Sequence, residues 1–182
     1  MDRIIIAVVL AVGLALPGVV HAQDENSGED GEPSVKEMRA AKKTDDESGV
    51  TVHRPNGWVF GKPGKGVIAL LTAAGDSQSQ IEVRVSKHVK KQLTKPFFAS
   101  FHSNIQKSGF VKVETRDNTQ YGQKKGSEVE YETGEGDKAF RLVVWQYHRA
   151  ETAYLVVGFF PKKARDIQYK DFQSVCEKLE LN

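Results

Sequence analysis

The chain has 182 residues, of which 39% are hydrophobic, with 26 basic and 24 acidic side chains. Nine Phe, five Tyr and two Trp are enough to build a core, so a wholly disordered chain and a collagen-like chain are excluded. The single cysteine, Cys176, excludes a disulfide within the chain. Charge is segregated: residues 23–48 carry a net charge of −5 from nine acids and four bases, whereas residues 49–182 carry +7 from 21 bases and 14 acids.

The first 22 residues have the pattern of a secretory signal peptide. Arg3 precedes an apolar run over residues 4–16, and Val20-His21-Ala22 is a small-x-small cleavage site. The run is shorter than the roughly 20 apolar residues of a membrane-spanning helix, which favours cleavage after Ala22 over an uncleaved anchor. Because no cysteine lies near this site, a lipoprotein is not expected. The sequence predicts an exported, soluble periplasmic or extracellular product without a transmembrane helix.

Residues 23–48 are predicted to be an acidic, disordered linker. Residues 23–33 contain five acids and no large apolar side chain, so burial cannot offset the entropy cost of ordering them. Residues 34–43 are rich in helix formers, but nothing in the sequence indicates what would hold a helix there. The acidic stretch is either an attractant for a basic partner or a solvating tether.

The folded domain is predicted to span residues 49–182. Short β-rich runs bounded by turn residues predict strands over residues 50–52, 58–60, 67–73, 81–85, 110–115, 126–133, 138–149 and 152–160. Two segments have helical spacing instead. The first is capped by Thr94, places Phe97, Phe101 and Ile105 on one face, and ends at Gly109.

The second helical segment follows Pro161 and carries Phe172, Cys176 and Leu179 on one stripe, which predicts a buried, inert thiol. The order is therefore strands, helix, antiparallel meander, helix. This order predicts an α+β domain in which helices pack on an antiparallel sheet.

The meander suggests its own strand register. Pairing Thr133 with Lys138 places Glu130 opposite Arg141 on one face of the sheet, which is a favourable cross-strand pair. A shift by one residue would exchange the two faces and bury the glutamates.

The segment Val52-His53-Arg54-Pro55-Asn56-Gly57-Trp58, with Phe60 soon after, resembles the start of PsbP-like domains. The likeness continues over the whole folded domain, roughly residues 50–181, through the mid-chain helix, the meander with Tyr131, the strand 153–157, and the closing helix with Tyr169 and Phe172. The fold of this family is shared with the yeast Ran-binding Mog protein and with bacterial DcrB-type secreted proteins of unknown function. The resemblance implies an α/β/α sandwich that serves as a binding scaffold, since PsbP binds a photosystem and the Mog protein binds a small GTPase. It implies no site residue.

Motifs for metal, cofactor or phosphate binding are weak. Four histidines lie beyond the signal peptide: His53, His88, His102 and His148. No two of them have the sequence spacing of metal ligands on one helix. The glycine-rich loop 61–66 lacks the Lys-Ser/Thr pair and the following helix of a phosphate-binding loop, so it is expected to be a mobile basic loop with at most weak anion contact. No metal and no cofactor is predicted.

Motifs for catalysis are equally weak. The segment 75–78 superficially resembles the start of a serine esterase motif, but it falls in a predicted hairpin turn and no Gly-x-Ser-x-Gly elbow exists. The basic residues are scattered, and the densest cluster is Lys87, Lys90, Lys91 and Lys95. Together with export, this scatter argues against a nucleic-acid partner. The cluster is expected to be solvated surface charge. The second explanation is attraction to a membrane surface or to an acidic partner.

Strand parity places Trp145 with other aromatic side chains on the face that also carries Arg141 and Arg149. If helices cover both faces of the sheet, these aromatic residues form a second core layer. If this face is open, it is an aromatic patch with a basic rim, of the kind that interfaces favour. On the second interpretation the predicted binding residues are Lys62, Lys65, Arg141, Trp145 and Arg149, provided that Trp145 is at least partly exposed.

The leading functional hypothesis is a non-enzymatic binding or assembly protein of the cell envelope with a protein partner. The alternative is a small hydrolase or lipid-associated enzyme without a recognisable motif. A pocket that brings a histidine against a serine and a carboxylate would favour the alternative.

Overall fold

The computed structural model describes residues 34–181; the predicted signal peptide and residues 23–33 of the predicted linker lie outside this range. The strands are β1 (Lys42–Asp45), β2 (Val50–His53), β3 (Trp58–Gly61), β4 (Ala69–Ala73), β5 (Asp76–Ser86), β6 (Val111–Tyr121), β7 (Lys124–Thr133), β8 (Phe140–Arg149), β9 (Thr152–Pro161) and β10 (Glu180–Leu181). The helices are α2 (Val35–Met38), α3 (Thr94–Lys107) and α4 (Arg165–Lys178), with short 3-10 turns η1 (Lys91–Leu93), η2 (Gly136–Lys138) and η3 (Lys162–Ala164). No described helix combines the length and the apolar character needed to cross a membrane.

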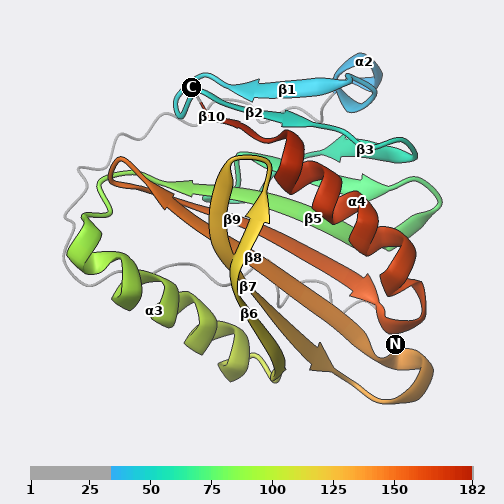
Figure 1. Cartoon of the computed structure of the whole chain (residues 1–182). Helices are drawn as coiled ribbons and strands as arrows, with labels where there is room; N and C mark the ends of the chain where they lie inside the picture. The colour runs from blue at the N-terminus through green and yellow to red at the C-terminus, as the bar shows by residue number, and fades with distance from the viewer. Residues whose placement is uncertain (1–33, 182) are drawn as a thin grey trace.

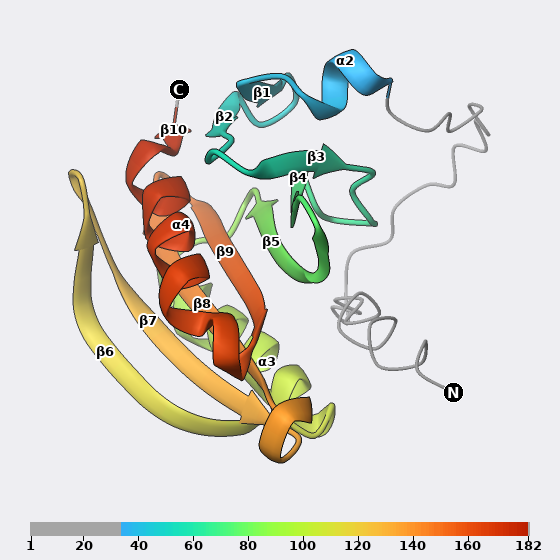
Figure 2. The ribbon, with the colours of Figure 1, turned by 90° about the vertical axis from the view of Figure 1, so that its right-hand side faces the viewer.

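Seven strands form one antiparallel sheet, and the two long helices lie on its opposite faces (Figure 1). The strand order is β3-β4-β5-β9-β8-β7-β6. Viewed from the side, α4 lies on one face of the curved sheet, with α3 behind the other (Figure 2). The core divides accordingly into an α4 layer around Trp145 and Phe172 and an α3 layer around Phe101 and Tyr131. The predicted α+β fold, an α/β/α sandwich, is confirmed.

Helix α3 forms where the spacing of phenylalanines predicts it. Phe97, Phe101 and Ile105 are its buried residues, and all three belong to the α3 layer. Thr94 is the first helical residue and not the cap, and its hydroxyl donates to the Lys90 carbonyl at 3.4 Å. The one-sided apolar stripe therefore fixes both the helix and the face on which it packs.

Helix α4 packs through Phe172 and Cys176, which are fully buried as the sequence predicts. Burial raises the pKa of the Cys176 thiol well above its ordinary value, which keeps it protonated. The strand beneath needs a glycine at position 158, because a Cβ there would lie 2.5 Å from the Phe160 ring and 2.8 Å from that of Phe172. The Trp58 indole N–H donates to the Asp171 carboxylate at 2.9 Å and so ties β3 to α4.

The meander differs from the predicted register by two residues. Thr133 pairs with Phe140 and not with Lys138, so that Glu132 stands opposite Arg141. Residues 136–138 form the turn η2, which lengthens the connection before β8 begins. Because the shift is even, each side chain keeps its predicted face.

A second, smaller sheet is formed by β1, β2 and β10 in that order. Residues 42–45 pair with 50–53, and the chain end returns to β2 through β10. The predicted linker is therefore wrong for residues 34–48, which form α2, β1 and a turn. The polar segment is ordered because backbone pairing to β2 supplies the partners that its own side chains do not.

Arg54 fastens this N-terminal segment to the large sheet. Its guanidinium donates to the carbonyls of Arg39 at 3.2 Å, Ala40 at 2.8 Å and Trp58 at 2.5 Å. Arginine suits this position since its donors are fixed in one plane and can reach several carbonyls at once. One residue of the PsbP-like opening segment thus has a direct structural role.

Candidate functional site

The residues predicted to form an aromatic binding patch do not share one surface. Trp145 is 0% exposed and belongs to the α4 layer of the core, so the condition for the patch fails. Arg141 and Arg149 lie at opposite ends of β8, about 27 Å apart at the usual rise per strand residue. Arg149 is exposed, and so are Lys62 and Lys65 on the loop between β3 and β4. The second core layer, the other interpretation of this face, is what the structure shows.

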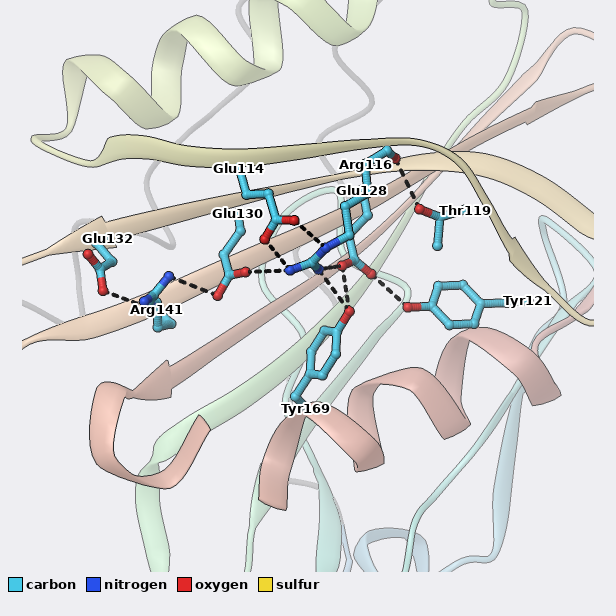
Figure 3. A network of polar contacts seen from close by, with 9 residues as sticks. All are labelled: Glu114, Arg116, Thr119, Tyr121, Glu128, Glu130, Glu132, Arg141 and Tyr169. Atoms are coloured by element: carbon cyan, nitrogen blue, oxygen red, sulfur yellow. Dashed lines mark hydrogen bonds and ion pairs between the residues drawn. The ribbon is translucent and has the colours of Figure 1, made fainter. Parts of the chain in front are cut away.

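The covered face holds a network of charged side chains around two buried carboxylates (Figure 3). Glu128 and Glu130 of β7 are 1% and 2% exposed, although the sequence predicts solvated glutamates here. Arg116 of the neighbouring β6 pairs with both carboxylates, and Arg141 of β8 pairs with Glu130 at 3.1 Å. The glutamates are buried because α4 lies over this face, and the two arginines offset the cost of removing their charges from water.

Two tyrosines complete the network around Glu128. The hydroxyls of Tyr121 and Tyr169 each donate to its carboxylate at 2.6 Å. Burial and then the bond to Glu128 raise the pKa of Tyr169 to about 12, and the same causes raise that of Tyr121 further. Since Glu128 also accepts from Arg116, both of its carboxylate oxygens are bound by donors of the chain. The network joins β6, β7, β8 and α4, and its carboxylates serve structure.

Sequence reasoning missed this network because it assigned the glutamates of β7 to solvent. A usable signal exists in the parity of the strands. Glu128 and Glu130 share a face with Trp145, and buried aromatic residues beside acids predict charged partners nearby. Arg116, which pairs with both glutamates, lies on β6. The strand predicted from the sequence ends at residue 115, one residue before this arginine.

A shallow cleft of about 700 Å³ opens on the α3 face beyond the helix. Ser127, Gln146, His148 and Asp117 line it, with Phe98 of α3 at its side. The cleft thus brings a serine, a histidine and a carboxylate to one place, which is the arrangement that would favour an enzyme.

The hydrogen bonds of this cleft do not link the serine to the histidine and the carboxylate. The Ser127 hydroxyl accepts from the Gln146 amide at 2.7 Å, and the Gln146 carbonyl oxygen accepts from His102 Nε2 at 2.8 Å. His102 Nδ1 lies 2.6 Å from the Tyr131 hydroxyl, which completes a chain from the cleft to the core. His148 Nε2 lies 2.7 Å from the Val89 carbonyl, so this nitrogen carries the proton.

These bonds leave the serine without a base. Burial lowers the pKa of His102 despite its bond to Gln146, so this imidazole is neutral at pH 7. Within residues 34–181 no hydrogen bond joins a serine to a histidine, and no cluster of three or more His, Cys, Asp or Glu could hold a metal ion. The arrangement of a nucleophile with its base is not formed.

A second cleft, of about 820 Å³, separates the small sheet from the end of β5. Its apolar lining comes from Pro63, Val67, Ile68 and Val85. Its charged lining comes from both sheets and consists of Lys43, Asp45, Asp46, Glu47 and Lys87, and His88 lines the cleft beside them. We call it the inter-sheet cleft. It combines an apolar lining with a charged one, as binding surfaces for protein segments do.

The basic loop 61–66 borders the inter-sheet cleft through Pro63 and Gly66. The sequence predicts that a strand begins at Val67, directly after the loop, but β4 begins at Ala69. The Val67 amide instead donates to the Gly64 carbonyl at 3.1 Å, so Val67 still belongs to the turn. Of the predicted set, Lys62 and Lys65 therefore lie on the loop that borders the inter-sheet cleft, next to residues that line it.

No protein-family model and no curated protein sequence matches the chain. Among solved structures, it is similar to cyanobacterial PsbP (CyanoP) from Synechocystis sp. PCC 6803, with a TM-score of 0.56 and 11% identity over 78% of this chain and 91% of that one. It is also similar to the Ran-binding protein Mog1p of Saccharomyces cerevisiae, with a TM-score of 0.54 and 9% identity over 79% and 96% of the two chains.

A third similar structure is a protein of Bacteroides thetaiotaomicron, with a TM-score of 0.55 and 14% identity over 80% of this chain. The match covers 49% of that protein, about half of its length. Identities this low establish the fold alone. The chain has the PsbP-like fold that its sequence predicts.

Proposed function

We propose that the chain is an exported, non-enzymatic binding protein of the cell envelope that holds a protein partner in the inter-sheet cleft. One observation carries the proposal: an apolar lining with a charged border, built where loops of both sheets meet. Its PsbP-like fold is compatible with such a role, since Mog1p, which shares that fold, is a Ran-binding protein.

Export rests on the signal-peptide pattern of the first 22 residues. The expected product begins at Gln23. N-terminal sequencing of the protein recovered from the periplasm or medium tests this expectation. An intact Met1 would contradict it.

The binding site is tested by reversing charge beside the cleft. We expect the double substitution Lys62→Glu and Lys65→Glu to weaken partner capture without changing the melting temperature, because both side chains are exposed. The partner is first identified by cross-linking from envelope extract with the chain as bait, and its affinity is then measured with purified protein. The matched control is Lys107→Glu with Lys138→Glu, which changes the net charge equally at exposed sites elsewhere. Equal capture by both double variants would place the site outside the cleft.

The second candidate function is hydrolysis, favoured by the meeting of Ser127, His148 and Asp117 in the cleft beside α3. Side chains can realign when a substrate binds, so the purified chain should be assayed on ester, peptide and glycan substrates. Turnover that Ser127→Ala abolishes and Ser103→Ala retains would replace the binding-protein proposal by an enzyme.

A further inference from the structure

One end of the molecule is basic and carries an exposed leucine. It is formed by the segment between β5 and α3 and by the β8–β9 turn, which lie together at the same end in Figure 1. We call this surface the basic end and define it by Lys90, Lys91, Leu93, Lys95 and Arg149. None of these residues lines the inter-sheet cleft.

The basic end is held rigidly by one buried residue. Val89 packs in the α3 layer, its amide donates to the Glu151 carbonyl at 2.8 Å, and its carbonyl lies 2.7 Å from His148 Nε2. His88 before it has a φ of 61°, so the chain bends sharply there. The residues after Val89 consequently turn outward in η1 and enter α3.

The side chains of this end are presented to solvent. Leu93 is 51% exposed, which is unusual for a large apolar residue on a rigid turn. Lys90, Lys91, Lys95 and Arg149 are all exposed, and within residues 34–181 no ion pair joins any of them to an acid. The nearby turn contributes one acid, Glu151, so this end has a net positive charge.

We propose that the basic end docks the protein on an anionic lipid surface, with Leu93 entering the headgroup region and the four basic side chains around it binding lipid phosphates. A leucine among solvated lysines matches an interface that is apolar inside and anionic at its surface. Each basic side chain near such a surface strengthens binding by about fivefold. A folded protein partner would instead need a larger complementary area than one leucine on a protruding turn provides.

The test uses the chain from Gln23 onward, which contains every described element, and vesicles of phosphatidylcholine with about one-third phosphatidylglycerol. We expect the protein to sediment with these vesicles at low salt and to dissociate from them as the salt concentration rises. It should not bind vesicles of pure phosphatidylcholine. Lys90→Gln, Lys91→Gln and Lys95→Gln together should weaken binding about a hundredfold. The control triple Lys107→Gln, Lys138→Gln and Lys170→Gln removes the same charge from exposed sites elsewhere and should weaken binding less than about fivefold.

Leu93 is tested separately. Leu93→Ser should reduce binding about tenfold at every salt concentration, and serine is a preferred N-cap residue, so α3 keeps its start. Leu93→Trp should show a blue shift of its fluorescence on anionic vesicles, because the native Trp58 and Trp145 are buried and do not respond. Equal losses in the test and control triples would overturn the proposal. So would a wild-type chain that fails to sediment with anionic vesicles yet binds polyglutamate, since the surface would then be one for acidic protein segments.

Discussion

At the scale of single residues, Glu128 is a buried acid that three side chains hold in place. Three donors from two elements converge on its carboxylate: Arg116 and Tyr121 of β6, and Tyr169 of α4. Because the carboxylate is shielded from water, these three donors stabilise its negative charge in place of solvent.

We expect Glu128→Gln to lower the free energy of unfolding by about 2–3 kcal/mol, because an amide keeps the shape but removes the charge that Arg116 faces. Urea denaturation followed by circular dichroism measures the loss. The control Glu135→Gln changes an exposed acid and should shift stability by less than about 0.5 kcal/mol. Equal effects of the two substitutions would mean that the network contributes nothing beyond its net charge.

Tyr169 links stability to alkaline pH. Its folded pKa is raised to about 12, above the ordinary value of about 10, so the folded state holds the proton more tightly than the unfolded state. Its contribution is fully present below about pH 10 and is lost as pH rises toward about 12. Denaturation at a series of alkaline pH values should show this decline, and Tyr169→Phe should make it shallower. An unchanged slope would assign the decline to other groups.

At the scale of elements, the short sheet and the segment before it depend on one side chain. Arg54 holds the carbonyls of Arg39 and Ala40, while β1 adds four residues to the edge of β2. We expect Arg54→Ala to release this segment and to speed tryptic cleavage at Lys42 and Lys43 severalfold, with the large sheet intact.

Mass spectrometry of a limited digest follows both cleavages directly. The matched control is Arg149→Ala, which removes an exposed arginine outside this segment and should leave the cleavage rate unchanged. Wild-type cleavage at these lysines as fast as in the Arg54 variant would contradict the anchoring role.

The elements that sequence alone predicts are those whose own side chains define a period. Phe97, Phe101 and Ile105 define α3, and the alternation around Val129 defines β7. By contrast, β1 has the sequence Lys-Lys-Thr-Asp, which contains no apolar residue, and it is a strand because β2 pairs with it. Such an element follows from long-range backbone pairing, which no local pattern encodes.

At the scale of the whole molecule, one sheet carries both core layers, so the layers should not unfold separately. Phe101 is buried in the α3 layer, whereas both tryptophans belong to the α4 layer. We expect Phe101→Ala to cost about 3–5 kcal/mol and to shift the tryptophan-fluorescence and circular-dichroism transitions together. Lys107→Ala on the exposed side of the same helix should cost less than about 0.5 kcal/mol. Separated transitions would show that the two layers unfold independently.

The site is less predictable than the fold for a related reason. Parity assigns Trp145 and Arg141 to one face, but whether that face is open depends on where α4 packs, 20 or more residues later in the chain. Likewise, Ser127 and His148 meet through sheet pairing between β7 and β8, at positions where no motif marks them. Loop exposure is more local, so Lys62 and Lys65 could be placed at the surface from the glycine-rich composition around them.

The isolation of Cys176 has a practical consequence for kinetics. It is the single thiol of the chain, it lies fully buried between α4 and the sheet, and burial keeps it in the unreactive protonated form. A thiol reagent in excess can therefore react only with molecules in which α4 has lifted from the sheet. The rate at which native protein gains the mass of one adduct gives the rate at which this thiol is uncovered, by a local movement of α4 or by unfolding of the whole molecule, with no substitution introduced.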